Sequence, residues 1–131
     1  MLRAVWLFFT RRVMSLTNQI QSYMQEPTKT KLADTLILLC QNSLWMPMTI
    51  LPKSGIKKVP DELIKGDRSY IPLFTDRKEI KDAYYNEFFW VRVSLPDLVD
   101  QYDAFVIDPF TTNFVIEKDL IEVIRQSRKE E

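Results

Sequence analysis

The chain has 131 residues, of which 46% are hydrophobic and 27% charged, and its 18 basic side chains balance 18 acidic ones. These proportions are typical of one soluble globular domain, and they exclude a disordered, collagen-like or disulfide-rich chain. There is no histidine, and Cys40 is the single cysteine. That excludes Cys/His zinc sites, Ser-His-Asp and Cys-His nucleophile systems and internal disulfides, so we expect no catalytic residues, no metal and no cofactor.

The N-terminal segment is apolar on every side and differs from the rest of the chain. Its apolar run, 4–9, is shorter than a membrane span or a secretory signal requires, so we expect no stable membrane insertion and a cytoplasmic protein. We interpret 1–13 as an extension of a single domain over 14–131. Either translation starts at Met14, or the segment forms an extra helix that packs on the core or on a second copy in a homodimer. Attachment to a membrane surface is the third alternative.

Two amphipathic helices are predicted at the start of the domain. The first begins at Ser15 and ends before Pro27, because apolar residues recur at spacings of four, three and one. Thr28 can cap the second helix, whose apolar face includes Leu39 and Cys40. We interpret Cys40 there as a small buried hydrophobe rather than a nucleophile.

The middle of the chain is predicted to contain strands and one helix. Residues 44–51 are too apolar for a loop, and Pro47 within them indicates an edge strand or a bulge. The stretch 52–68 contains both glycines and several lysines, which indicates a long exposed loop or a loose hairpin connection. A short strand over 70–74 and a helix over 76–85, opened by a capping-box spacing, are expected next.

The C-terminal part is predicted to alternate strands and helices. Residues 87–93 are rich in aromatic and β-branched side chains, which predicts a strand, and Ser94 can cap a short helix after it. Two strands, 104–107 and 114–116, and a final helix over 118–125 complete the chain. The order predicts an α+β single domain: N-terminal helices, then one layer of mixed β-sheet with helices packed on it, and a C-terminal helix.

Few residues suggest chemistry. Two glycines are too few for a phosphate-binding loop. The C-terminal third is mostly acidic and would repel a phosphate backbone, so we expect no nucleic-acid partner. Its carboxylates lack the calcium-loop pattern, and we interpret them as solubilising charge. The aromatic residues Trp45, Trp90 and the Phe88–Phe89 pair are assigned mostly to the core, with an exposed aromatic patch as the alternative.

Three short motifs follow one another along the chain: Trp45-Met46-Pro47-Met48, Tyr70-Ile71-Pro72-Leu73-Phe74-Thr75-Asp76 and Phe105-Val106-Ile107-Asp108-Pro109-Phe110. Over 32–124 this order resembles the N-terminal domain of the SseB family, the enhanced serine sensitivity proteins of bacteria. The resemblance implies a small bacterial cytoplasmic α+β domain with no assigned enzymatic activity. Asp108 stands where that family more often has Asn, and the resemblance does not extend to the second domain of its longer members.

The expected function is a non-catalytic protein-binding or adaptor module, and its candidate site lies at strand ends. Thr75 and Asp76 end one strand, Asp108 and Pro109 end another, and both ends are expected at one exposed rim of the sheet. Pro109 is expected to hold Asp108 extended and to present Phe110 as an aromatic anchor, with Asp76 and Asp108 supplying polar specificity. Alternatively, these residues only cap a helix and shape a turn, and Phe110 folds back onto the core.

Two other kinds of function remain open from the sequence. One is a small-ligand domain or an enzyme that uses only carboxylates, Asp76 and Asp108, in the manner of acid–base pairs. The other is a purely structural or oligomeric role. A deep polar pocket around the two carboxylates would favour the enzyme, whereas a flat surface with exposed aromatic residues would favour the binding module.

Overall fold

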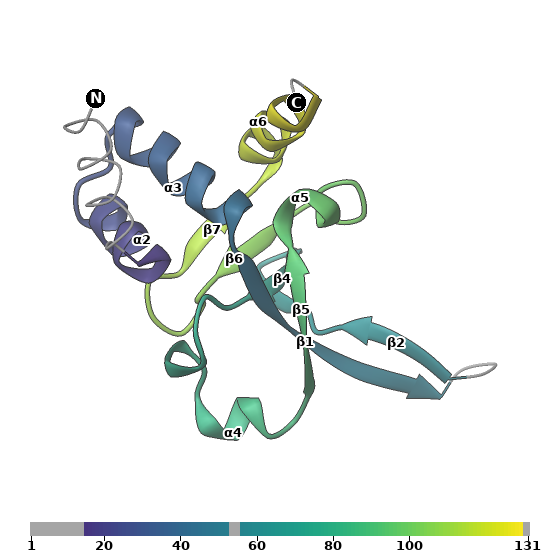
Figure 1. The fold of residues 1–131 in the computed structure, drawn as a ribbon. Coiled ribbons are helices and arrows are strands. Elements are labelled where there is room, and N and C mark those ends of the chain that lie inside the picture. The colour runs from purple at the N-terminus through teal and green to yellow at the C-terminus, as the bar shows by residue number, and fades with distance from the viewer. Residues whose placement is uncertain (1–14, 53–55, 130–131) are drawn as a thin grey trace.

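The structure is a computed structural model that describes residues 15–52 and 56–129. The expectations for residues 1–13, including a start at Met14, lie outside the described residues. Within them, the fold is α+β, with helices at both ends and strands between them, as the sequence predicts (Figure 1). No described helix is long and apolar enough to cross a bilayer.

The two N-terminal helices form where their capping residues place them. The side chain of Ser15 accepts a hydrogen bond from the Asn18 N–H, and that of Thr28 accepts one from the Lys31 N–H. These side chains satisfy amide groups that have no partner within the helix. The helices are α2 (Leu16–Gln25), α3 (Lys29–Gln41), the 3₁₀ helix η1 (Arg77–Glu79), α4 (Asp82–Tyr85), α5 (Leu95–Leu98) and α6 (Lys118–Lys129).

The strands form two sheets rather than the single layer predicted. One sheet has the order β2-β1-β5 and is antiparallel; the other has the order β3-β4-β6-β7, in which only β4 and β6 are parallel. Paired backbone hydrogen bonds between Trp45 and Phe74, of 2.8 and 2.9 Å, join the sheets. The strands are β1 (Ser43–Pro52), β2 (Ile56–Pro60), β3 (Leu63–Lys65), β4 (Arg68–Leu73), β5 (Phe89–Ser94), β6 (Phe105–Ile107) and β7 (Phe114–Ile116).

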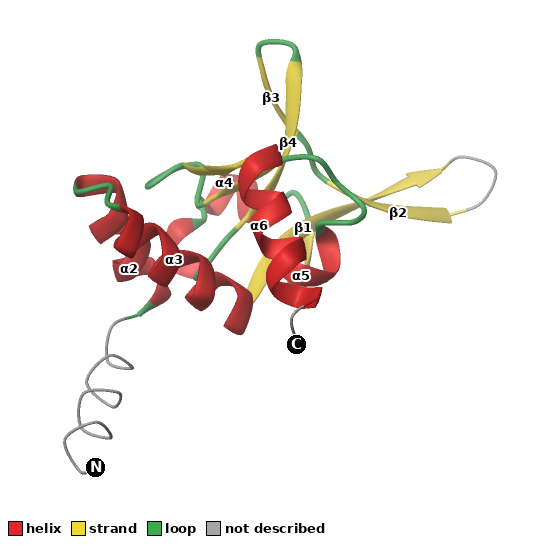
Figure 2. Ribbon diagram, turned by 90° about the horizontal axis from the view of Figure 1, so that it is seen from above, coloured by secondary structure: helices red, strands yellow, loops and turns green. Residues whose placement is uncertain are grey.

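The main core lies between the sheets and four helices. Helices α2, α3, α5 and α6 cover one side, whereas α4 lies on the other, and the β1–β2 and β3–β4 hairpins project from the body (Figures 1 and 2). The core side chains come from every covering helix and from both sheets: Ile20, Leu36, Leu39, Leu44, Met46, Ile71, Leu73, Leu95, Leu98, Val99, Phe105, Ile107, Phe114, Ile116, Ile121 and Ile124. Cys40 is half-buried against this cluster.

Pro47 lies in a central strand, so the predicted edge strand is wrong. Strand β1 has β5 on one side, and on its other side it meets first Phe74 and then β2. Pro47 falls between these two partners, just before the β2 pairing begins at Met48. Its missing N–H therefore interrupts no ladder hydrogen bond, and its carbonyl accepts from the Asp61 N–H at 3.0 Å.

Two further segments differ from the prediction. The expected loop over 52–68 contains β2, β3 and the start of β4, with Gly66 in the left-handed region (φ 63°) at the β3–β4 turn. The expected helix over 76–85 is split into η1 and α4 by Ile80, whose backbone is extended and whose side chain is buried. Ser94 begins α5, but its side chain makes no capping hydrogen bond.

Helix α6 holds the end of α5 in place. Arg125 donates to the Val99 carbonyl, Arg128 donates to the Pro96 carbonyl at 2.7 Å, and both guanidinium groups pair with Asp100. Cations bound to the carbonyls at a helix end satisfy acceptors that the helix itself leaves free. Because α5 directly follows β5, this clamp also fixes the end of that strand.

A second cluster, which is aromatic, attaches α4 to the sheets. The fully buried Phe74 ring lies 5.9 Å from the Tyr84 ring, 5.4 Å from Trp90 and 5.7 Å from Phe110, between centroids. The Tyr84 hydroxyl donates to the Asp61 carboxylate. Burial first, and the Asp61 carboxylate second, raise the pKa of Tyr84, so the phenol stays protonated as a donor.

We expect Phe74→Ala to lower the free energy of unfolding by about 3–5 kcal/mol, because it removes a buried ring that contacts three others. Urea denaturation followed by circular dichroism measures this change. Ile64→Ala, at a side chain that is 75% exposed on β3, is the control and should cost less than about 1 kcal/mol. Equal losses in the two variants would contradict the central packing role of Phe74.

Candidate functional site

The structure brings the ends of β4 and β6 together at one rim, as the sequence predicts. The Asp108 carboxylate accepts a hydrogen bond from the Thr75 N–H at 2.9 Å and another from the Thr75 hydroxyl at 2.7 Å. The parallel pairing of β4 with β6 places these two residues just beyond the Leu73–Ile107 pair. The rim therefore forms from a strand register rather than from flexible loops.

A threonine of α2 extends this hydrogen-bonded group. The Thr17 and Thr75 hydroxyl oxygens lie 2.8 Å apart. Because Thr75 has one hydroxyl proton and donates it to Asp108, the Thr17 hydroxyl must donate to Thr75. The hydrogen-bonded group Thr17–Thr75–Asp108 thus links α2, the first described helix, to the ends of β4 and β6.

Asp108 is not extended, so that prediction is wrong. Its φ is 51°, in the left-handed region where Asp and Asn are enriched among non-glycine residues. In this conformation its carbonyl accepts from the N–H groups of Thr111 and Asn113, at 3.1 and 2.8 Å. Pro109 excludes right-handed helical geometry at the preceding residue but leaves this left-handed turn open.

The Asp108 carboxylate is wholly buried and cannot supply polar specificity to a partner, which corrects the second expectation about it. Burial raises its pKa from 3.8 to about 6, although the two hydrogen bonds from Thr75 act in the opposite direction. Repulsion from Glu79 and Asp76 adds to the increase. Asp108 thus has a structural role, and at neutral pH its buried negative charge lowers the stability of the folded protein.

The other predicted site residues also bind within the chain. Asp76 is half-buried and accepts from the Lys78 N–H, which caps η1. The half-buried Phe110 ring lies 5.1 Å from the Tyr84 ring, with the Lys81 ammonium 4.9 Å from its centroid. Pro109 is half-buried beside it. Phe110 therefore folds back onto the aromatic cluster instead of standing free as an anchor.

Three cavities in the described part of the chain lie away from the two carboxylates. Their lining residues include neither Asp76 nor Asp108. The cavity of about 420 Å³ beside the β3–β4 hairpin is lined mainly by polar side chains, among them Glu62, Arg68 and Asp103. No group of three potential metal ligands gathers among the residues described.

Sequence reasoning missed the open edge of β5. Strand β5 ends its sheet, and across residues 15–52 and 56–129 no strand pairs with its outer side. The Trp45 N–H and carbonyl form hydrogen bonds with Phe74, on the side of β1 that faces away from β5. The residues of β1 on either side of Trp45 therefore form the hydrogen bonds to β5, and their partners in β5 are Val91 and every second residue from it. The N–H and carbonyl groups of Trp90 and Arg92 consequently point outward from the sheet.

The β5 strand is accessible along its whole length. All six of its side chains are at least partly exposed, whereas all three of β6 are buried. Arg92 is the one charged side chain on this strand, and β5 contains no proline. By contrast β2, at the opposite edge of the same sheet, presents Lys57, Lys58 and Pro60 within five residues.

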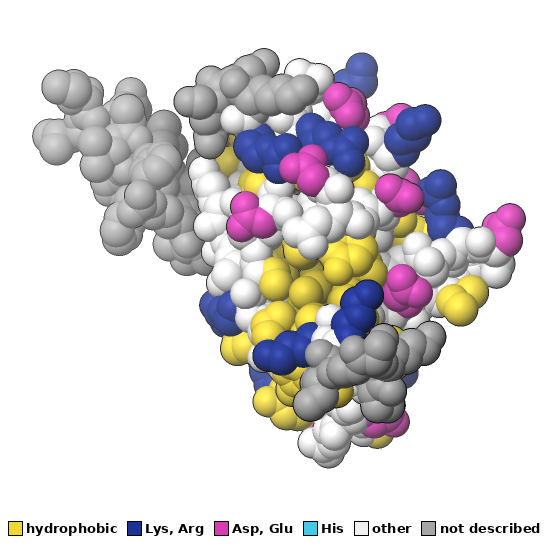
Figure 3. Space-filling view, turned by 90° about the vertical axis from the view of Figure 1, so that its right-hand side faces the viewer, with side chains coloured by type: hydrophobic (Ala, Val, Ile, Leu, Met, Phe, Trp, Pro, Cys, Tyr) yellow, Lys and Arg dark blue, Asp and Glu magenta, His cyan; other side chains and the backbone are white. Residues whose placement is uncertain are grey.

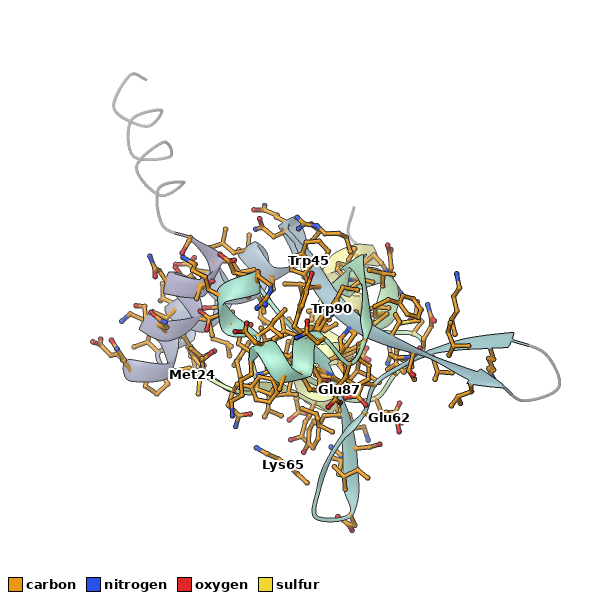
Figure 4. All side chains as sticks on the ribbon, turned by 90° about the horizontal axis from the view of Figure 1, so that it is seen from below. Met24, Trp45, Glu62, Lys65, Glu87 and Trp90 are labelled. Carbon is orange, nitrogen blue, oxygen red and sulfur yellow. The ribbon has the colours of Figure 1, made fainter. Side chains whose placement is uncertain are left out.

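Two tryptophans and an arginine lie together on the sheet face next to this edge. The Arg92 guanidinium is 4.5 Å from the centroid of the Trp45 ring, which it faces across the β1–β5 pair. Trp90 stacks on Tyr85, with ring centroids 5.5 Å apart, and its indole N–H donates to the Tyr85 carbonyl at 3.0 Å. Figure 4 shows both tryptophans on the underside of the molecule. Both are half-buried, so neither is a fully buried core residue, although Trp90 packs against the buried Phe74 ring in the aromatic cluster.

The three-stranded sheet is also uniform in charge. Strands β1, β2 and β5 carry the basic residues Lys57, Lys58 and Arg92 and no acidic residue within their bounds. Ile50 and Leu51 are exposed near the end of β1. Figure 3 shows hydrophobic side chains gathered on the face toward which the β1–β2 hairpin projects, with basic side chains beside them.

Comparison with protein-family models, with curated proteins and with solved structures finds no match. A functional proposal for this chain therefore stands on its own geometry.

We expect Asp108→Asn to stabilise the protein at neutral pH. The native pKa of about 6 exceeds the unfolded value of 3.8. The charge therefore costs stability above about pH 6, and the cost disappears as the pH falls toward 4. At 1.36 kcal/mol per pKa unit the gain reaches at most about 3 kcal/mol near pH 7.5, and Asn suits the left-handed turn equally well.

Urea titrations of both proteins between about pH 4 and 7.5 measure this difference in unfolding free energy. Asp103→Asn, at an exposed position, is the matched control for the loss of one negative charge. A gain from Asp108→Asn that does not shrink on acidification would show that its charge is not the cause.

We expect Phe110→Ala to lower the unfolding free energy by about 2 kcal/mol, less than the 3–5 kcal/mol of a fully buried ring, because Phe110 is half-buried against Phe74 and Tyr84. Thermal and urea denaturation check this value, with Val123→Ala on α6 as the exposed control. A loss below about 1 kcal/mol would instead restore Phe110 as a free anchor.

Proposed function

We propose that this protein is a non-catalytic protein-binding module, consistent with the cytoplasmic SseB-like adaptor that its motifs suggest. The observation that carries the proposal is the open outer edge of β5, which is accessible and largely apolar. A partner would bind by adding one extended segment to the β2-β1-β5 sheet as a fourth strand.

The backbone geometry supports this mode of binding. The outward N–H and carbonyl groups of Trp90 and Arg92 offer a ladder of donors and acceptors to an incoming strand. Main-chain hydrogen bonds of this kind supply affinity with little dependence on sequence, whereas the alternating side chains select the partner. An exposed strand edge with a single charged side chain is also a template for pairing with another chain, so a partner that covered it would satisfy its free backbone groups.

The surrounding side chains support the proposal in a second way. Tryptophan and arginine are the residue types most enriched among those that dominate binding energy at protein interfaces. Trp45, Trp90 and Arg92 lie next to the edge, and the aromatic cluster holds Trp90 firmly from below. The partner would therefore meet an ordered surface. Asp108 is buried and accepts two hydrogen bonds from Thr75, so its carboxylate is not presented to a partner or a substrate.

We expect a photoreactive residue at position 87 to crosslink a protein partner in the native cell. Glu87 is exposed and lies two residues before the start of β5 at Phe89, so a residue there would lie near the end of an added strand. The same photoreactive residue at position 37 is the control, because Ile37 is 54% exposed and belongs to α3, a helix on the opposite side of the sheets from α4 (Figure 1). Mass spectrometry of the crosslinked species measures the outcome.

Arg92→Pro should abolish the crosslinks formed from position 87. Proline removes the outward N–H, and it is tolerated on the outer side of an edge strand. Crosslinks that form equally from positions 37 and 87, or that survive Arg92→Pro in a folded protein, would contradict binding at the β5 edge.

A further inference from the structure

The chemistry of the sheet next to the open edge selects among extended segments. We infer that the segment added to β5 is acidic, with acidic side chains alternating with apolar ones. This inference rests on the proposed function, but it can fail on its own, because a strand of any other composition could add to the same edge.

The register of β5 fixes which side chains a partner meets. Side chains alternate between the two faces of a strand, and residues paired across a sheet point to the same face. A partner residue opposite Arg92 therefore lies on the face of Trp45 and Trp90, next to a guanidinium group. Partner residues opposite Val91 and Val93 lie on the other face, beside partly exposed valines that pack against the core. An acidic residue suits the first position and apolar residues suit the second.

The charge of the sheet agrees with this preference, although Arg92 is the only charged side chain on β5 itself. Opposite charges paired across strands are favourable, and like charges are unfavourable. The three strands carry three basic side chains and no acidic ones. Lys57 lies on the same face as Arg92 but on β2, at the opposite edge of the sheet, so Arg92 is the basic side chain that an added strand would meet. Glu87 is the nearest acidic residue before β5, and it lies outside the strand.

The same observations disfavour two other occupants. A second copy of this chain, paired through β5, would bring a second Arg92 and no acidic side chain from its own strand, so the two edges would lack charge complementarity. A nucleic acid could stack bases on Trp45 beside Arg92, but it has no strand backbone to pair with the outward groups of Trp90 and Arg92. An acidic polypeptide satisfies both the charge and the hydrogen-bonding edge.

The test uses synthetic fluorescent octapeptides and the full chain. The probe alternates Glu and Val, with N-methyl groups along one edge so that it cannot self-associate. Its controls are the alternating Lys and Val peptide and a peptide with the same four Glu and four Val in two blocks. Fluorescence anisotropy should show binding of the alternating acidic probe at least about tenfold tighter than of either control, because only that probe has both the charge and the period.

Variants at position 92 separate the side chain from the backbone. Arg92→Glu should weaken binding of the acidic probe by about tenfold or more and favour the lysine peptide. Arg92→Ala and Arg92→Pro both remove the guanidinium, but only the proline variant loses the outward N–H. The proline variant should therefore bind about three- to tenfold more weakly than the alanine variant. Lys29→Glu, at an exposed position at the start of α3, is the control for charge reversal.

Each contrary result identifies what has failed. Equal or tighter binding of the lysine peptide, or no binding of the acidic probe at millimolar concentration, overturns the acidic segment, whereas crosslinking from position 87 would still support strand addition. Equal binding by the alanine and proline variants overturns edge pairing itself. Displacement of the probe by oligothymidylate would indicate a nucleic acid. Dimerisation that ultracentrifugation detects and that Arg92→Pro removes would indicate a second copy.

Discussion

Trp45 and Phe74 exchange a pair of backbone hydrogen bonds that hold the two sheets against each other. The side chains of the same residues extend the junction in both directions. The Phe74 ring enters the aromatic cluster that attaches α4, while the Trp45 ring lies under Arg92 beside the open edge. The Trp45 N–H and carbonyl point away from β5, so the next residues of β1 in either direction form the hydrogen bonds to β5. In that register the backbone amides of Trp90 and Arg92 point away from β1. The candidate binding edge is thus a consequence of one bridge.

The Thr17–Thr75–Asp108 group secures the neighbouring end of the structure. Thr75 follows Phe74 immediately in the chain, and its hydrogen bonds to Asp108 and Thr17 connect β4 to β6 and to α2. A buried carboxylate without a basic partner is an expensive means of holding these elements, as its raised pKa shows. The Asp108 carboxylate fixes the position of Thr75, because it accepts hydrogen bonds from both the backbone N–H and the hydroxyl of that residue. The rim expected to contact a partner instead fixes β4, β6 and α2 relative to one another.

How much the sequence could predict depended on how local the cause was. The α+β class and the first two helices were predictable because Ser15 and Thr28 act within a few residues of themselves. Pro47 was misplaced because its tolerance depends on Phe74 and Asp61, which are distant in the chain. The open side of β5 follows from a sheet order that no local pattern encodes. At the site, the meeting of Thr75 with Asp108 was foreseen, but the burial that makes Asp108 structural was not, since an Asp-Pro turn is usually exposed.

The clamp of α6 on α5 has a consequence for recognition. Arg125 and Arg128 fix the helix that follows β5, and Trp90 is fixed against Tyr85 near the start of the strand. The edge is therefore held at both ends, and the proposed addition of a strand would cost this protein little conformational entropy. Almost the entire entropy cost of ordering would fall on the incoming segment. A segment that is already extended in its free state would lose the least entropy, so the affinity of the proposed complex would depend as much on the stiffness of the partner as on its contacts.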